Sequence, residues 1–149
     1  MRVVVQRVLW TRIWVEEQLV SETGPGLMVL LGVEHQDTAR DAVYLAEKIA
    51  NLRVFEDAQG KMNRSLLEVG GEIMLVSQFT LLADCRKGKR PSFSSAAEPA
   101  MAAHWYQFLG EKLQTMGFRV ATGVFGARMR VESVNDGPVT LLIDSRRSL

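Results

Sequence analysis

Cysteine and histidine are nearly absent from this chain of 149 residues, in which Cys85 is the only cysteine and His35 and His104 are the only histidines. One cysteine excludes an intrachain disulfide. Two distant histidines and one cysteine fall short of the roughly three or four ligands, at set spacings, that a zinc site requires. A Walker loop, a dinucleotide fingerprint and a GxSxG nucleophile elbow are missing too. The sequence therefore predicts a protein with no metal and no cofactor.

Long apolar runs are missing as well. No run approaches the roughly 20 residues that span a bilayer. The apolar start of the chain is broken at Gln6 and Arg7, and it lacks the cleavage site of a signal peptide. Together with the lone cysteine, this composition predicts a cytoplasmic location and no membrane partner.

Charge of one sign is scarce, because the net charge is only +1. A protein that coats nucleic acid without regard to sequence is usually more basic, so any contact with RNA is expected at a local patch. The candidate is segment 86–90, which holds four cations in five residues, including Arg86, Lys87 and Arg90. Such a run is also typical of a solvated loop, and both interpretations remain open.

Strand-like and helix-like patterns alternate along the chain, whose length suits a single domain over residues 1–149. Apolar spacing predicts a helix over 37–51, capped by Asp37 or Thr38, and a second over 98–116, with Pro99 in its first turn. Strands are predicted over 2–8, 13–20, 27–33, 73–79, 118–121, 129–134 and 139–143, with short pieces at 53–55 and around Met62. The pattern predicts an α/β or mixed α+β domain, without deciding whether its sheet closes into a barrel.

The motif Ser77-Gln78-Phe79-Thr80 ends the strongest of these predicted strands. Strand alternation would place Gln78 and Thr80 on one face, where both could line a pocket. Thr80 is a candidate nucleophile, but no base that would activate it is visible, and Cys85 has the same deficit. Backbone N–H groups near Phe79 and Thr80 could instead stabilise an oxyanion. The plainer alternative is that Thr80 is only a β-branched strand residue.

A second motif, Asn135-Asp136-Gly137-Pro138-Val139-Thr140, separates the last two predicted strands. Pro138 removes a backbone donor and fixes φ, and Gly137 permits backbone geometry that other residues avoid. Taken alone, this motif is most simply interpreted as a surface turn.

The two motifs resemble the SQFT and NxGPxT signatures of the D-aminoacyl-tRNA deacylases. The likeness extends over essentially the whole chain, because segments 6–8, 26–33, 60–63, 90–94 and 125–129 match the family in order and spacing. The resemblance implies a barrel-like mixed β-sheet carrying two α-helices, assembled as a homodimer. It also implies hydrolysis of the ester between a D-amino acid and the terminal adenosine of tRNA, with some action on glycyl-tRNA. Catalysis in the family is thought to be assisted by the 2′-hydroxyl of that adenosine.

The resemblance also implies how one hand of amino acid is rejected. In the family the Gly-Pro peptide is cis and enters the pocket of the partner subunit, where its carbonyl groups lie near the α-amino group of the substrate. Gly137 and Pro138 would then collide with an L side chain and leave a D side chain free, which is selection by exclusion.

Further roles follow from the resemblance, residue by residue. Arg7 would orient the Gly-Pro peptide, although it is also explicable as a charge at a strand edge. Arg86, Lys87 and Arg90 would meet phosphates of the acceptor stem, and the SQFT residues would carry catalysis. The residues expected to bind substrate or adenosine are Phe125, Gly126, Ala127, Met129, Asn135, Val139 and Thr140, of which Phe125 is equally explicable as core.

The chain departs from the family after residue 8, where Thr11 and Arg12, with Trp10 and Trp14 nearby, replace the usual small residues. This departure leaves the packing of the second strand open. Two functions other than the deacylase also stay open. One is a noncatalytic module that binds the 3′ end of tRNA, and the other is an unrelated esterase with a threonine or cysteine nucleophile.

Overall fold

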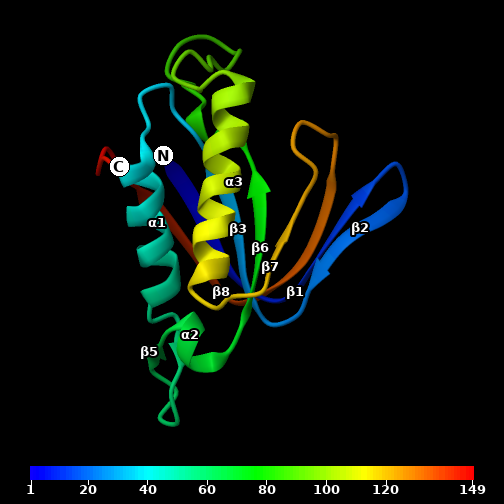
Figure 1. The fold of residues 1–149 in the computed structure, drawn as a ribbon, viewed down its shortest axis with the longest axis vertical. Helices are drawn as coiled ribbons and strands as arrows, with labels where there is room; N and C mark the ends of the chain where they lie inside the picture. Colours follow the sequence, from blue (N-terminus) through cyan, green and yellow to red (C-terminus); the bar gives the residue numbers. More distant parts are fainter.

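The computed structural model describes all residues, 1–149, and has one mixed α+β domain. Two long helices, α1 (Ala39–Asn51) and α3 (Pro99–Thr115), cover one face of a six-stranded sheet (Figure 1). The strands of this sheet are β1 (Arg2–Val15), β2 (Gln18–Thr23), β3 (Gly26–Gly32), β6 (Glu72–Ser77), β7 (Val120–Thr122) and β8 (Arg130–Asp144). A separate hairpin of β4 (Phe55–Glu56) and β5 (Met62–Arg64) leads into the short helix α2 (Leu66–Val69).

Strand β1 organises the sheet. It pairs antiparallel with β8 along nearly its whole length, with β3 along its first half and with β2 along its second half. The parallel strands β6 and β7 then extend the sheet from β3. Because β2 also lies against β6 and β7, the sheet curls into a nearly closed barrel. The barrel-like mixed sheet that the family resemblance implied is therefore confirmed.

The first difference from prediction concerns the second strand, which was expected to begin at Ile13. Instead β1 continues to Val15 and reverses at Glu16 and Glu17, whose φ angles are 48° and 63°. Such two-residue hairpin turns are usually made by Asn-Gly or Asp-Gly, so two glutamates gave no turn signal. Strand β2 therefore begins at Gln18.

The last two predicted strands are in fact one strand, β8. Its pairing with β1 passes from Gln6↔Thr140 to Val8↔Asn135, so residues 136–139 bulge out opposite Arg7. The extra residues of a bulge need no ladder partner, and a strand can therefore carry Gly-Pro without ending. The interpretation of this motif as a turn between two strands was wrong.

The third helix, α2, was not predicted, and only two helices were expected. Ser65 and Glu68 form a capping box at its start, and Gly70, with φ at 66°, ends it. A helix of four residues is too short to show an apolar period, so only these capping residues could have signalled it. By contrast, the predicted caps of the long helices are present, with Thr38 before α1 and Pro99 at the start of α3.

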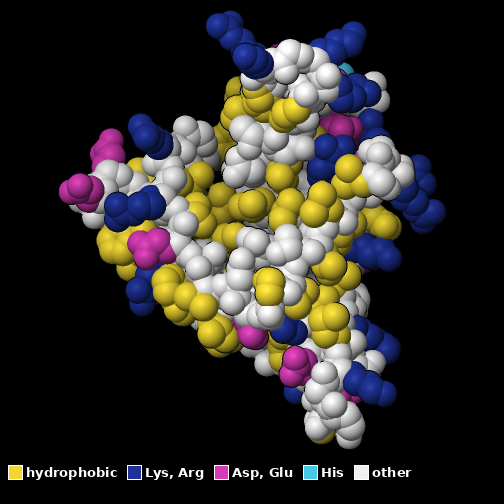
Figure 2. Space-filling view, turned by 180° about the vertical axis from the view of Figure 1, so that it is seen from behind, with side chains coloured by type: hydrophobic (Ala, Val, Ile, Leu, Met, Phe, Trp, Pro, Cys, Tyr) yellow, Lys and Arg dark blue, Asp and Glu magenta, His cyan; other side chains and the backbone are white.

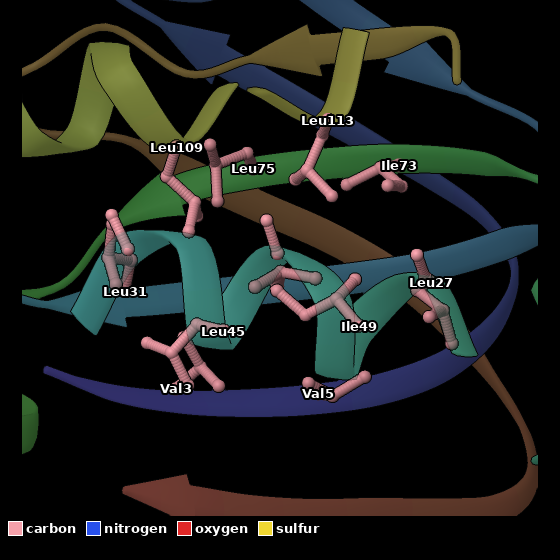
Figure 3. Close-up of a cluster of buried hydrophobic side chains, with 14 of the residues drawn as sticks. Val3, Val5, Leu27, Leu31, Leu45, Ile49, Ile73, Leu75, Leu109 and Leu113 are labelled. Atoms are coloured by element: carbon pink, nitrogen blue, oxygen red, sulfur yellow. The ribbon is translucent and has the colours of Figure 1, made fainter. Parts of the chain in front are cut away.

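The main hydrophobic core lies between the sheet and the two long helices (Figure 3). Its members include Val3 and Val5 of β1, Leu27 and Leu31 of β3, Ile73 and Leu75 of β6, Leu45 and Ile49 of α1, and Leu109 and Leu113 of α3. Alternate strand residues form a smaller cluster on the other face, made of Val8, Ile13, Met28, Met74 and Val76. Because both faces of β3 and β6 are apolar, these strands read in the sequence as continuous apolar runs.

The face of the sheet away from the helices also carries apolar side chains at its surface (Figure 2). Among the large apolar side chains on strands, Leu142 has the largest exposed fraction, at 61%, and Leu9 is 48% exposed. None of the helices combines the length and the apolar composition that a bilayer crossing would require.

Candidate active site

Strand β6 carries the SQFT motif to a tight turn. The strand ends at Ser77, and Phe79–Leu82 form a 3-10 helix. The Gln78 N–H donates to the carbonyl oxygen of Leu31 at 2.7 Å, which anchors the turn to the end of β3. The first N–H groups of a helical turn, here those of Phe79 and Thr80, have no acceptor within it. These two donors are therefore free of the turn's own hydrogen bonds.

The prediction that Gln78 and Thr80 share a strand face was wrong, because the strand ends before them. Their side chains are nevertheless adjacent, since Gln78 Nε2 donates a hydrogen bond to Thr80 Oγ1. Thr80 is exposed and hydrogen-bonds to no basic side chain. Cys85 is exposed in the following loop and does not line the cleft described next. Neither hydroxyl nor thiol is placed beside a base.

A cleft of about 490 Å³ opens beside the turn, within the size range usual for ligand pockets. Two segments far apart in sequence meet in its walls, namely Ser77, Gln78 and Phe79 from the end of β6 and Phe125, Gly126, Ala127 and Met129 from the segment before β8. The remaining lining residues, which the sequence analysis missed, are Val33, Val76, Ala96, Ala97, Pro99, Ala102 and Val131. All of them are apolar, and nothing in the sequence separates such residues from ordinary core.

Phe125 lines the cleft and packs against Tyr106 of α3. Its side chain is 36% exposed, and its ring lies 6.0 Å from the ring of Tyr106 in a tilted arrangement. The Tyr106 hydroxyl donates to the carbonyl oxygen of Leu75 at 2.8 Å, and burial raises the pKa of Tyr106 to about 12. Phe125 is thus packed from behind by a fixed aromatic ring while part of its surface faces the cleft.

The Gly137–Pro138 peptide bond is cis and lies on the exposed bulge of β8. At Gly137 φ is 130°, and a Cβ would come within 3.0 Å of Val139 Cγ2 and 3.1 Å of Arg7 Nη2. This position therefore accommodates only glycine. None of the predicted residues of this motif, Asn135, Gly137, Pro138, Val139 and Thr140, lines the cleft of the same chain.

Arg7 lies behind this bulge and is 6% exposed. Its Nε donates to the carbonyl oxygen of Asp136 at 3.0 Å, and its Nη1 donates to the carbonyl oxygen of Val54 at 2.6 Å. Arg7 is therefore a buried brace of the bulge, and the alternative of a solvated charge at a strand edge does not fit its burial. At the other side of the bulge, Thr140 Oγ1 accepts a hydrogen bond from Gln6 Nε2 at 3.3 Å.

The cations of segment 86–90, called the basic loop from here on, differ in their partners. Arg86 binds the Asp84 carboxylate through Nε and Nη2, at 2.9 and 2.7 Å. These hydrogen bonds hold the pKa of Asp84 well below its usual range. Lys87 and Arg90 are exposed and form no ion pair. The charges of Lys87 and Arg90, more than that of Arg86, are therefore free to meet an anion. No group of three or more His, Cys, Asp or Glu side chains in the molecule could hold a metal ion.

Comparison with known proteins shows to which family the chain belongs. The family model described as D-Tyr-tRNA(Tyr) deacylase matches residues 4–144. The chain belongs to the D-Tyr-tRNA(Tyr) deacylase family. A D-aminoacyl-tRNA deacylase of Geobacillus sp. (strain WCH70) is 54% identical over 98% of this chain and 96% of that relative. Another, of Bacillus thuringiensis (strain Al Hakam), is 51% identical over 98% of this chain and 100% of that relative.

Solved structures share the fold. A c-Myc DNA unwinding element binding protein superposes with a TM-score of 0.91 at 39% identity, covering 97% of this chain and 98% of that one. A probable eukaryotic D-amino acid tRNA deacylase superposes with a TM-score of 0.81 over 95% of this chain and 97% of that one. The second is only 19% identical, so its likeness concerns the fold alone.

Proposed function

We propose that this chain hydrolyses the ester bond of D-aminoacyl-tRNA, and that the cleft receives the terminal adenosine with its amino acid. The observation that carries the proposal is the meeting of Ser77–Phe79 and 125–129, two separate family motifs, in the walls of one cleft. Phe125 offers an aromatic surface to an unpaired base, and base stacking of this kind is the usual way in which proteins hold single-stranded RNA. A tRNA substrate also accords with a cytoplasmic location.

The proposed reaction needs few groups from the protein. A water oxygen attacks the ester carbonyl carbon, the bond to the ribose oxygen breaks, and that oxygen leaves with a proton. The free N–H groups of Phe79 and Thr80 are suited to stabilise the charge that develops on the carbonyl oxygen. Neither Thr80 nor Cys85 has a base beside it, which is compatible with the role that the family resemblance implies for the vicinal 2′-hydroxyl of the adenosine, namely to position the water. Gln78 lines the cleft and holds the Thr80 hydroxyl beside it by a hydrogen bond, although Thr80 itself is not a lining residue.

The chiral selection is assigned to Gly137 and Pro138 of a second copy of the chain. This peptide is exposed, is braced from behind by Arg7 and lies outside the cleft of its own chain. In a homodimer it would enter the cleft of the partner subunit and present its carbonyl groups to the substrate's α-amino group. An L side chain would collide with this backbone, whereas a D side chain or glycine would not.

Hydrolysis of D-tyrosyl-tRNA compared with L-tyrosyl-tRNA tests the proposal. We expect turnover of the D ester and rejection of the L ester, with partial turnover of glycyl-tRNA, because nothing grips the side chain. A substrate with a 2′-deoxy terminal ribose should lose most of the rate. Equal turnover of both enantiomers would refute the chiral filter, and tight binding of the tRNA end without any turnover would favour the noncatalytic module.

Two single substitutions test whether the protein is instead an esterase with a threonine or cysteine nucleophile. Thr80→Ala should leave measurable activity, and Cys85→Ala should be nearly silent, because neither residue has an activating base. Complete loss of turnover in either variant, with the fold intact by circular dichroism, would favour covalent catalysis by that residue.

A further inference from the structure

A second groove lies beside the cleft, at the tip of the β1–β2 hairpin. Its volume is about 380 Å³, and it is lined by Trp14, Glu16, Glu17, Arg128, Met129 and Arg130. Met129 also lines the cleft proposed for the terminal adenosine. The two hollows are therefore adjacent, with Met129 between them.

The groove combines an aromatic ring with unpaired charges of both signs. Arg130 pairs with Trp14 across β1 and β8, and its guanidinium carbon lies 5.4 Å from the centre of the Trp14 ring. None of Glu16, Glu17, Arg128 and Arg130 takes part in an ion pair. Figure 2 shows acidic and basic side chains gathered at this end of the molecule. The unpaired arginines suit an anionic group of a ligand, and the tryptophan ring suits a flat group. The unpaired glutamates suit a hydrogen-bond donor.

The turn of the β1–β2 hairpin supplies the acidic side chains of the groove. Glu16 and Glu17 both occupy the left-handed region, with φ at 48° and 63°, where glycine or asparagine would be unstrained. This geometry is the usual one for a two-residue hairpin, and it places two carboxylates at the rim of the groove.

We propose that this groove binds the nucleotide that precedes the terminal adenosine, which is a cytidine because tRNA ends in CCA. This inference rests on the proposed function. The cytosine base takes the place of the Arg130 guanidinium over the Trp14 ring, and Arg130 turns to join Arg128 on the phosphate that links the base to the adenosine. Cytosine presents an exocyclic amino group, and carboxylates are its usual acceptors, so Glu16 or Glu17 accepts from it. Uracil has a carbonyl oxygen in place of this amino group, which would set an acceptor against the carboxylates.

The test uses D-tyrosyl esters of adenosine, of the dinucleotide CpA and of UpA. We expect kcat/KM of the native protein to be roughly tenfold higher for the CpA ester than for the adenosine ester, the gain expected of one stacked base. The UpA ester should lie between them. Trp14→Ala should abolish most of the CpA gain, Trp14→Phe should keep part of it, and the double variant Glu16→Ala/Glu17→Ala should remove the preference for C over U.

Trp10→Ala is the matched control. Trp10 lies on the same strand under the guanidinium of Arg12, at 4.7 Å, but outside the groove, so the CpA gain should persist in this variant. If Trp14→Ala fails to fold, Arg128→Ala provides a second measure, because its exposed side chain should contribute part of the gain. Equal kcat/KM for the adenosine and CpA esters would overturn the inference. Enantiomer selection on the adenosine ester alone would show that the proposed function survives that result.

Discussion

Arg7 and Asp136 are joined across strands β1 and β8 by a hydrogen bond of 3.0 Å from Arg7 Nε to the Asp136 carbonyl oxygen. The Asp136 carboxylate lies 3.5 Å from the same Nε, and a second N–H of the guanidinium reaches the carbonyl oxygen of Val54. One buried cation therefore satisfies backbone groups from two segments and fixes the bulge that carries Gly137 and Pro138.

Arg7→Ala is expected to loosen the bulge. Two carbonyl groups would lose their donor, which costs about 1–3 kcal/mol of unfolding free energy when a buried group is left unsatisfied. The mobile Gly-Pro peptide would also discriminate less well, so the ratio of kcat/KM for D- over L-tyrosyl-tRNA should fall. Urea unfolding and hydrolysis of both enantiomers measure the two effects.

Arg7→Lys is the matched variant for this experiment. A lysine keeps the charge, but one ammonium group cannot reproduce the planar fork that reaches both carbonyl groups. We expect intermediate stability and intermediate selectivity. If both variants select D over L as well as the native protein does, the brace has no part in selection.

Gly137→Ala is expected to lower both stability and enantiomer selection strongly, because of the local backbone geometry. The residue has φ at 130°, and an added Cβ would come within 3.1 Å of both Arg7 Nη2 and the Val139 backbone nitrogen. A residue with a side chain in such a region costs about 1–3 kcal/mol, and the bulge would have to shift. The D/L ratio should fall together with stability. Gly24→Ala is the control, since its Cβ would meet nothing within 4 Å, and it should change neither quantity.

The sequence predicted the motifs of the site better than it predicted the strands and turns that carry them. SQFT and segment 125–129 were matched to the family from their residues, and most of them line one cleft, but Thr80 and Arg128 do not. The Gly-Pro motif interrupts two apolar runs, and only pairing with β1 shows that the runs belong to one strand. The turn at Glu16 and Glu17 has no local signal, because its geometry is imposed by the two strands it joins. Likewise, the apolar walls of the cleft are defined by long-range packing, which no local pattern encodes.

Tyr106→Phe tests the support behind Phe125. At neutral pH the variant should lose about 0.5–1.5 kcal/mol with the hydrogen bond to the Leu75 carbonyl group. Burial raises the pKa of Tyr106 to about 12, above the roughly 10 of an exposed tyrosine. The folded state thus favours the neutral hydroxyl, and this stabilisation is complete below pH 10 and is lost as the pH rises through about 12.

The native protein should therefore lose its advantage in unfolding free energy over Tyr106→Phe as the pH is raised from 10 towards 12. Urea unfolding of both proteins at a series of alkaline pH values gives the difference in unfolding free energy. A difference that stays constant over this range would mean that Tyr106 ionises without cost in the folded state.

Lys87→Ala/Arg90→Ala is expected to raise KM for D-tyrosyl-tRNA and leave kcat nearly unchanged, because these cations lie outside the cleft. Each phosphate contact contributes roughly 0.9 to the slope of log affinity against log salt, so the slope of log KM should fall by about 1–2. Arg86→Ala should have a smaller effect, since Asp84 already neutralises its guanidinium. The D-tyrosyl ester of adenosine has no phosphate, and its KM should be insensitive to all three substitutions. An unchanged KM for the tRNA substrate in the double variant would show that the loop is only solvated.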